Sequence, residues 1–422
     1  MYDFMRLHEF SEEQRLMWET AKNVVDDVII PFNRANRERE WLMSPEDRLL
    51  PTEIVTALDQ SGIRTLMIPE EYGGTELEAG TVATTCCLVA TELARGDAGI
   101  ANALTPIWKS AILYKKYMPK EFQDEWFPKI MADPHFLSCQ AVSEPQGASD
   151  RWLPYEVPET KLKSTAVLDG DEWVINGGKQ FITNGYDANL IQLYVTTDKA
   201  ANMWQGTSCI IVPRETPGVS VTRCNETLGL RYMNNGELVF QDVRVPKDYM
   251  MIENTALGAA DIVFYRLVKV IQSAYGLGLC LAAWNDAATF TQDNKQGGRE
   301  IIKHQSIAVR MSDMAIKITA LRAFIFSAAK ALDEDPESED AGLQCEMLKV
   351  FAADTAIEIC HQAVEIHGGY GTMIEFGVEK YLRDALMFSH MDGTKDICAF
   401  RLMQKFFPDT KGAYAGPVAK PA

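Results

Sequence analysis

The period of the hydrophobic pattern changes twice along the 422-residue chain, and these changes limit the folds open to it. Residues 1–135 carry apolar side chains mostly at helical spacing, residues 136–250 form short β-rich runs, and helical spacing then returns. Strands and helices do not alternate, so a Rossmann-type parallel sheet is disfavoured. The order predicts an α+β protein with an N-terminal α-helical domain (1–135), a small middle β-domain (136–250), a C-terminal bundle of four-helix type (251–410) and a tail (411–422).

Capping residues and helix breakers place the individual helices. Ser11 and Gln14 form a capping box before the first helical pattern, and Pro31 is expected to end that helix. Further helical patterns cover residues 52–62, 81–94 and 107–117 in the first domain and 261–292, 305–332 and 344–366 in the last, where a shorter helix and a final one before residue 408 follow.

Glycine-containing dipeptides separate the β-rich runs. Asp169-Gly170 and Asn176-Gly177 are both strong signals for tight turns. The second of these turns is expected to precede a strand that carries alternating aromatic and hydroxyl side chains.

Composition excludes several classes of partner. The 47% hydrophobic and 24% charged residues are globular proportions, and the net charge of −18 argues against nucleic acid and anionic membranes. No apolar run approaches the roughly 18 residues of a membrane-spanning helix, and the N-terminus carries acids where a signal peptide is basic. We therefore expect a cytoplasmic protein with no membrane insertion.

The cysteines and histidines do not indicate a metal centre. Nine cysteines are scattered without a CxxC pair, and the six histidines lack metal-ligand spacing. We expect no metal site, and buried free thiols in a reducing compartment.

Four segments combine polar residues with glycines in ways that suit ligand binding, although each also has a purely structural explanation. Residues 140–150 end a strand with small and hydroxyl side chains, or form a capped loop. Residues 175–185 place an aromatic and a hydroxyl on one strand, or form an ordinary hairpin. Residues 367–371 bring glycines to a helix end, or only cap that helix. Residues 381–394 end in a loop carboxylate that is a candidate base, or only the N-cap of the next helix.

Taken together, the four segments resemble the acyl-CoA dehydrogenase family of flavoproteins over nearly the whole chain. The resemblance implies FAD bound between the β-domain and the bundle, with Ser143 and Thr183 bonded to the isoalloxazine edge and Phe181 over its face. It implies that the family's FAD-binding residues correspond here to Gln140, Val142, Ser143, Phe181, Thr183, Lys295, His304, Gln305, Glu365, Gly368, Gly369, Thr394 and Asp396.

The resemblance also implies the reaction and its partners. A base removes the α-proton of a CoA thioester while a hydride leaves the β-carbon, and the backbone N–H of the base residue bonds the thioester carbonyl. Asp392 occupies the position of the base, Ser149, Arg266 and Gly393 correspond to substrate-side residues, and an electron-transfer flavoprotein or similar acceptor takes the electrons. Family members are usually homotetramers that share their FAD sites between subunits.

The chain departs from the family pattern at the base. Most members have glutamate where this chain has Asp392, and a second group uses a glutamate at the position of Tyr265. The shorter carboxylate favours a branched or alicyclic acyl group, because it is withdrawn by about one C–C bond, roughly 1.5 Å. Asp97 is the other acid considered as the base, with Asp392 then only a helix cap.

The loop aspartate also leaves a second function open. The related nitroalkane oxidase, a flavin oxidase without CoA, has aspartate in this loop, paired with an arginine seven residues later. That position is Ala399 here, and Arg401 lies two residues further on.

Overall fold

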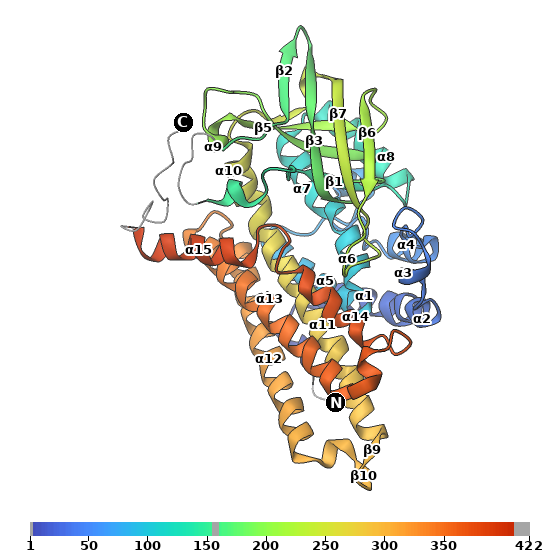
Figure 1. Ribbon diagram of the computed structural model, residues 1–422. Coiled ribbons are helices and arrows are strands. Elements are labelled where there is room, and N and C mark those ends of the chain that lie inside the picture. Colours follow the sequence, from blue (N-terminus) through green and yellow to red (C-terminus); the bar gives the residue numbers. More distant parts are fainter. Residues whose placement is uncertain (1–2, 154–159, 409–422) are drawn as a thin grey trace, which may run out of the picture.

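The computed structural model describes residues 3–153 and 160–408 of the chain, so the predicted tail at 411–422 lies outside the described residues. Figure 1 shows the β-domain at one end, long C-terminal helices running away from it, and N-terminal helices along one side. The predicted α+β class is confirmed.

Helices make up the N-terminal domain. They are α1 (Glu12–Val24), α2 (Ile30–Ala35), α3 (Arg39–Leu42), α4 (Thr52–Gln60), α5 (Val82–Gly96), α6 (Ala98–Leu104), α7 (Pro106–Tyr117) and α8 (Lys120–Ala132). The predicted capping box is present, because the Ser11 hydroxyl accepts from the Gln14 N–H and the Gln14 side chain accepts from the Ser11 N–H. The sequence patterns did not identify α6 and α8 as separate helices.

The prediction that Pro31 ends the first helix is wrong. A π-helical turn at Val25–Ile29 follows α1, and α2 continues the helical path with Pro31 in its first turn. A proline removes one backbone N–H from the helical ladder, and a locally widened turn accommodates that loss.

The β-domain is a mixed eight-stranded sheet. Its strands are β1 (Ser138–Ala141), β2 (Thr165–Asp169), β3 (Glu172–Thr183), β4 (Leu190–Thr196), β5 (Thr207–Pro213), β6 (Val219–Cys224), β7 (Asn235–Pro246) and β8 (Met250–Ile252). The order is β6-β7-β3-β2-β4-β5-β8, and β1 pairs in parallel with β4. This pairing brings the end of β1 near the end of β3, on the side of the sheet that faces the helices (Figure 1).

Only one of the two predicted turns is present. Gly170 joins β2 to β3 with φ +63°, as the sequence predicts. Asn176-Gly177 instead lies inside β3, where the register with β7 shifts after Ile175. Gly177 has φ +150°, and a Cβ there would stand 2.3 Å from the Ser164 hydroxyl oxygen. This glycine serves a bulge and a close backbone approach, which is the other common use of glycine in strands.

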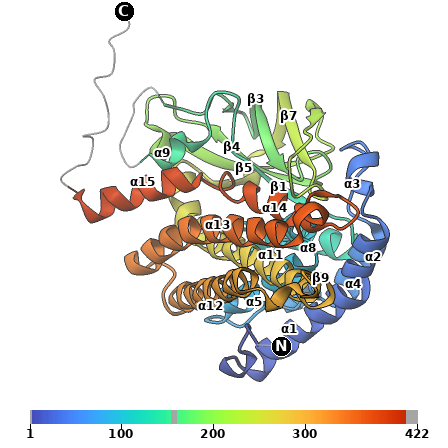
Figure 2. The same ribbon diagram turned by 60° about the horizontal axis from the view of Figure 1, so that its bottom comes forward.

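The C-terminal domain is a helical bundle around one central helix. Its helices are α10 (Ala256–Ala260), α11 (Arg266–Asp293), α12 (Gln305–Glu334), α13 (Glu339–His367), α14 (Val378–Met387) and α15 (Lys395–Phe406); the short helix α9 (Met203–Gly206) belongs to the β-domain, and a small hairpin of β9 (Lys295–Gln296) and β10 (Arg299–Glu300) joins α11 to α12. Figure 2 shows α11 among α5, α12 and α13. A Cβ at Gly278 would lie 2.3 Å from the Thr91 carbonyl oxygen, so this glycine permits α11 to pack closely on α5.

The expectation that no segment has the length and composition of a membrane span is wrong for α11. This helix is long and apolar enough by those criteria, but 89% of its most apolar window is buried inside the fold. A central bundle helix is apolar on all sides for the same reason as a membrane helix, because water contacts few of its residues. All nine cysteines are buried free thiols, as predicted.

Candidate functional site

A cavity of about 410 Å³ lies where all three domains meet. The N-terminal domain contributes α6 and α7, the β-domain contributes the ends of β1 and β3, and the C-terminal domain contributes the loop between α14 and α15. The lining residues central to the chemistry are Lys109, Gln140, Val142, Ser143, Arg151, Phe181, Thr183, Tyr265 and Asp392. The predicted ring-contacting residues and the predicted base therefore share one cavity.

The β-domain side of the cavity presents short polar groups. The Gln140 amide donates to the Gln192 side-chain oxygen at 2.7 Å, which orients it across β1 and β4. The Ser143 carbonyl accepts from the backbone N–H of Gln180, which ties the segment after β1 to β3. The Thr183 hydroxyl has the Met233 sulfur at 3.3 Å. Thioether sulfur is a weak acceptor, so this hydroxyl retains its capacity to bond a ligand.

Phe181 is the clearest sign that a flat group belongs in this cavity. Its ring is 60% exposed, and its backbone has φ +58° in the left-handed region. A bulky residue in that region costs of order 1–3 kcal/mol and persists where the surrounding structure requires it. An exposed aromatic beside the polar groups of Ser143 and Thr183 fits a planar heteroaromatic ring such as the FAD isoalloxazine. The contact of these residues with FAD stays a prediction.

Asp392 is held at the cavity by a chain of buried polar side chains. The Gln272 amide nitrogen, from α11, donates to Asp392 Oδ2. The Gln272 side-chain oxygen accepts from the Lys349 ammonium at 2.7 Å, and that ammonium also donates to the Phe388 carbonyl at 2.7 Å. Burial lowers the pKa of Lys349 to about 8. The carboxylate is therefore oriented by two bundle helices that the sequence patterns did not connect with it.

The loop around Asp392 is a tight turn into α15. Asp392 has φ +46° and Gly393 has φ +91°. The Thr394 hydroxyl caps α15 by accepting from the Ile397 N–H. The cap is Thr394, so the alternative in which Asp392 is only the N-cap of this helix is wrong.

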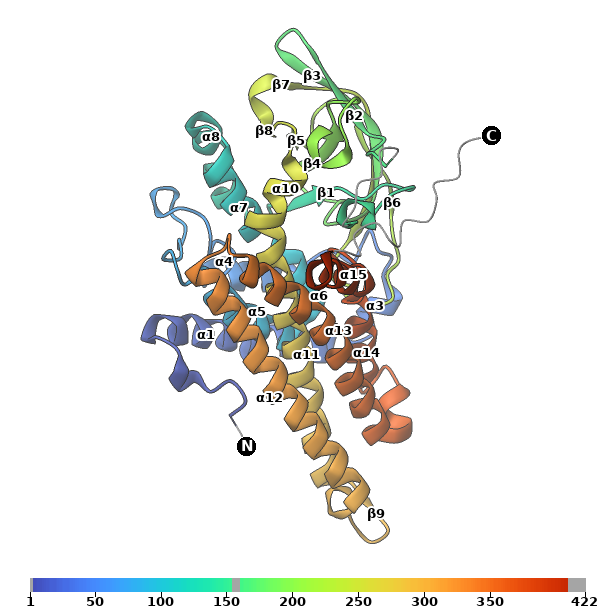
Figure 3. The same ribbon diagram turned by 90° about the vertical axis from the view of Figure 1, so that its left-hand side faces the viewer.

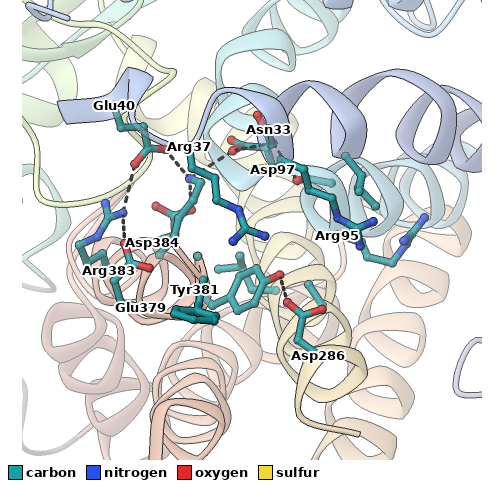
Figure 4. Close-up of a pocket in the computed structure, with 18 of the residues that line it drawn as sticks. Asn33, Arg37, Glu40, Arg95, Asp97, Asp286, Glu379, Tyr381, Arg383 and Asp384 are labelled. Atoms are coloured by element: carbon teal, nitrogen blue, oxygen red, sulfur yellow. Dashed lines mark hydrogen bonds and ion pairs between the residues drawn. The ribbon is translucent and has the colours of Figure 1, made fainter. Parts of the chain in front are cut away.

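Asp97, the other acid considered as the base, lines a second cavity. Figure 4 shows it with Glu40 and Asp384, where helices of the N-terminal domain face the C-terminal bundle. Its side chain caps α6 by accepting from Ile100 N–H, and it lies 3.1 Å from the Lys380 ammonium. Burial raises the pKa of Asp97 to about 6. Within the chain this carboxyl is a structural cap and ion-pair partner, separate from the cavity that contains Phe181.

The three predicted substrate-side residues do not all line the cavity that contains Phe181 and Asp392. Ser149 begins a 3₁₀ turn at Ser149–Trp152, directly after the cavity-lining Ala148. The Arg266 guanidinium donates to the Pro336 and Ser338 carbonyls at 2.6 and 2.7 Å, so the loop before α13 holds it. Gly393 is buried in the Asp392 loop. The substrate-binding roles of these three residues stay predictions. The contacts of Arg266 do not support such a role, because its guanidinium is bound to the loop before α13 and not directed into the cavity lining.

A second set of predicted FAD residues lies at the far end of the bundle. Lys295, His304 and Gln305 belong to the turn between α11 and α12, which Figure 3 shows at the opposite end of the molecule from the β-domain. His367 stacks on Phe290 at 4.3 Å, which places the adjacent Gly368 and Gly369 at the same end. Glu365 is half exposed beside Arg310. Asp396 does not belong to this distant set, because it is exposed at the start of α15, directly after the Asp392 loop. One chain therefore does not bring the two sets of residues to one cavity.

Two cationic residues of the cavity were missed by sequence reasoning. Lys109 is 6% exposed and lies on the apolar helix α7, and Arg151 is 7% exposed and has its guanidinium over the Trp152 ring at 5.2 Å. The available signal was a lysine between Trp108 and Ala111 on a face that is otherwise apolar. Gln272 and Lys349 gave the same weak signal inside the α11 and α13 patterns.

The fold and this cavity define a three-domain flavoprotein of the acyl-CoA dehydrogenase class, and comparison with known proteins agrees. Three family models match in chain order: the acyl-CoA dehydrogenase N-terminal domain at residues 11–133, the middle domain at 139–243 and the C-terminal domain at 269–405. The chain belongs to the acyl-CoA dehydrogenase family, FAD-dependent oxidoreductases that act on CH–CH groups of acyl-CoA esters.

Named relatives cover most of the chain. A probable acyl-CoA dehydrogenase of Mycobacterium leprae is 31% identical over 82% of this chain and 85% of its own length. A glutaryl-CoA dehydrogenase of Desulfococcus multivorans is 29% identical over 92% of this chain and 95% of its own length. Among solved structures, a glutaryl-CoA dehydrogenase complex with glutaryl-CoA has a TM-score of 0.83 at 26% identity, covering 94% of this chain and 96% of the other.

Proposed function

We propose that this chain is an FAD-dependent dehydrogenase that removes the α-proton and a β-hydride from a CoA thioester and releases the α,β-unsaturated thioester. The observation that carries the proposal is that the Asp392 carboxylate lines the same cavity as Phe181 and Thr183. A carboxylate beside a site for a planar redox ring is the arrangement that coupled removal of a proton and a hydride requires.

The residues of the chain supply the proton transfer and the orientation. Gln272 donates to Asp392 Oδ2 and so fixes the direction in which the carboxylate faces the cavity, where it would accept the α-proton. Lys349 fixes the Gln272 amide with its nitrogen toward Asp392, because the ammonium occupies the amide oxygen. Ser143, Phe181 and Thr183 would hold FAD. When bound, FAD supplies the hydride acceptor.

The acyl group that fits best is branched or alicyclic. Asp392 is one methylene shorter than the family's usual glutamate, so its oxygens stand back from the reacting carbon by about one C–C bond. A misplacement of this size costs on the order of 10²-fold in rate with an unchanged substrate. A bulkier acyl group compensates by bringing its acidic carbon closer to the carboxylate.

A homotetramer would complete the FAD site. The second set of predicted FAD residues lies at the far end of the bundle from the cavity, which is the arrangement expected if each site is shared. Val309 and Ile316, 60% and 68% exposed, stand seven residues apart on one face of α12 and offer an apolar surface to another subunit.

We expect an electron-transfer flavoprotein or similar acceptor to reoxidise the protein. Buried free thiols support a cytoplasmic location.

The alternative is a flavin oxidase of the nitroalkane oxidase type, which the loop aspartate favours. That relative pairs its aspartate with an arginine, whereas Asp392 here accepts from Gln272. Arg401 is bound by Asp261 and by Glu346, the latter at 2.7 Å. The contacts of Asp392 therefore support the dehydrogenase.

An anaerobic titration separates the two functions. The purified flavoprotein is mixed with a panel of straight, branched and cyclic acyl-CoA esters and, separately, with nitroethane, and the visible absorbance of the flavin is followed. Bleaching by a thioester, with slow reoxidation in air, supports the dehydrogenase. Bleaching by nitroethane alone, with stoichiometric hydrogen peroxide in air, contradicts it.

A further inference from the structure

Lys109 carries a buried charge in the active-site cavity for which the described chain supplies no partner. Its side chain is 6% exposed and lines the cavity together with Asp392. Across residues 3–153 and 160–408, its ammonium takes part in no hydrogen bond and no ion pair. Burying an ammonium without a partner is costly, so such a group is usually explained by a ligand or by chemistry.

Three other buried lysines of this protein each have an oxygen acceptor for their ammonium group. Lys179, Lys269 and Lys349 are each nearly inaccessible, and each ammonium has a carboxylate or amide oxygen at 2.7 Å. Lys109 is also buried, at 6% exposed against 1–2% for the other three, but it lacks that oxygen. The difference is therefore specific to the position that faces the cavity.

The charges around the cavity leave it short of anions. Asp392 is the acid that favours the charged form of Lys109, while burial lowers the pKa of this lysine. Asp392 Oδ2 accepts a hydrogen bond from the Gln272 amide, and Lys109 donates none to it. Glu226, the other carboxylate on the lining, is bound by two arginines. Arg151 adds a second cation, whose guanidinium donates to a carbonyl and lies over aromatic rings.

We propose that Lys109 binds a second carboxylate, carried by the acyl chain of the substrate, so that the preferred substrates are acidic acyl-CoA esters. This inference rests on the proposed function and adds the class of acyl group to it. A carboxylate at the far end of the acyl chain would give the ammonium the oxygen that it lacks. A branched or cyclic acyl group that also bears a carboxylate satisfies both Lys109 and Asp392.

Matched thioesters test this preference directly. Succinyl-, glutaryl- and adipyl-CoA are compared with butyryl-, pentanoyl- and hexanoyl-CoA, pairs that differ only by a carboxylate in place of the terminal methyl. In the best pair we expect the acidic ester to reduce the flavin with a kcat/KM roughly 10–100-fold higher, the range of a charged hydrogen bond.

Variants on α7 assign the preference to the lysine. Lys109→Met should lose more rate with the acidic ester than with the neutral one, and so remove the advantage of the acidic ester. Lys109→Arg should keep part of that advantage. Lys116→Met is the matched control, because Lys116 is exposed on the same helix. If Lys109→Met does not fold, Lys109→Gln and the wild-type preference decide.

The outcomes distinguish this inference from the proposed function. A wild-type preference for neutral esters overturns the role of Lys109 and leaves the dehydrogenase intact. Equal losses with both members of a pair in Lys109→Met also overturn it, because Lys109 then acts on Asp392. Failure of every thioester to bleach the flavin removes the proposed function and this inference together.

Discussion

Replacing Gln272 by leucine tests whether this amide orients the base. The side chain makes two hydrogen bonds to charged groups, one to the Asp392 carboxylate and one from the Lys349 ammonium at 2.7 Å. Leucine keeps much of the volume and removes both. A hydrogen bond to a charged group contributes about 1.5–3 kcal/mol.

The two lost bonds affect different measurements. Asp392 borders the cavity, so water replaces the lost donor there, and the carboxylate is less well oriented. Lys349 is fully buried and keeps only the Phe388 carbonyl. We therefore expect a loss of about 1.5–3 kcal/mol in the free energy of unfolding, from Lys349 alone, and a fall in the flavin-reduction rate on the order of 10²-fold from misplacement of the base.

The assays are denaturant unfolding and anaerobic stopped-flow reduction with the best thioester. Gln292→Leu is the matched control, because Gln292 lies on the same helix and is exposed. A Gln272→Leu protein that loses stability but reduces its flavin at the wild-type rate would refute the orienting role, since the amide would then serve only Lys349.

Three further predictions concern buried charges and the ring site. Burial lowers the pKa of Lys349 from 10.5 to about 8, so the folded state binds fewer protons than the unfolded chain between those values. Stability then rises with pH across that window by about 3 kcal/mol, and Lys349→Met should abolish the rise in denaturant titrations. Burial raises the pKa of Asp97 from 3.8 to about 6, so stability falls as pH rises through that window; Asp97→Asn, which keeps the α6 cap, should remove the fall. Phe181→Ala should weaken FAD binding by roughly 3–10-fold, as measured by fluorescence titration of the apoprotein, while its melting temperature stays unchanged because the ring is exposed.

Hydrophobic period and turn chemistry were sufficient to predict the arrangement of the elements. The capping box at Ser11 and the turn at Gly170 form as expected, because both depend on residues within four positions of each other. Pro31 and Gly177 were misread for the opposite reason. A π-helical turn next to Pro31 and the Ser164 backbone beside Gly177 decide their roles, and neither is visible in a local pattern.

The site residues that belong to short sequence motifs could be predicted, whereas those brought together from distant helices could not. Asp392, Phe181 and Thr183 belong to short motifs, so a family resemblance is enough to single them out. Lys109, Gln272 and Lys349 reach the same cavity or the same carboxylate from three different helices. Each is one polar residue in a long apolar pattern, and only tertiary packing shows what it faces.

The central claim is that Asp392 removes the substrate proton in an acyl-CoA dehydrogenase reaction. The most direct measurement is anaerobic single-turnover reduction of the flavin in Asp392→Asn, with the wild type's best thioester and with Asp248→Asn, an exposed aspartate in the β-domain, as the control. Asparagine keeps the shape of the side chain and cannot take the proton. The account predicts that reduction slows at least 10²-fold, on the order of the general-base contribution, while the thioester still binds. Reduction at a rate close to that of the wild type would contradict it.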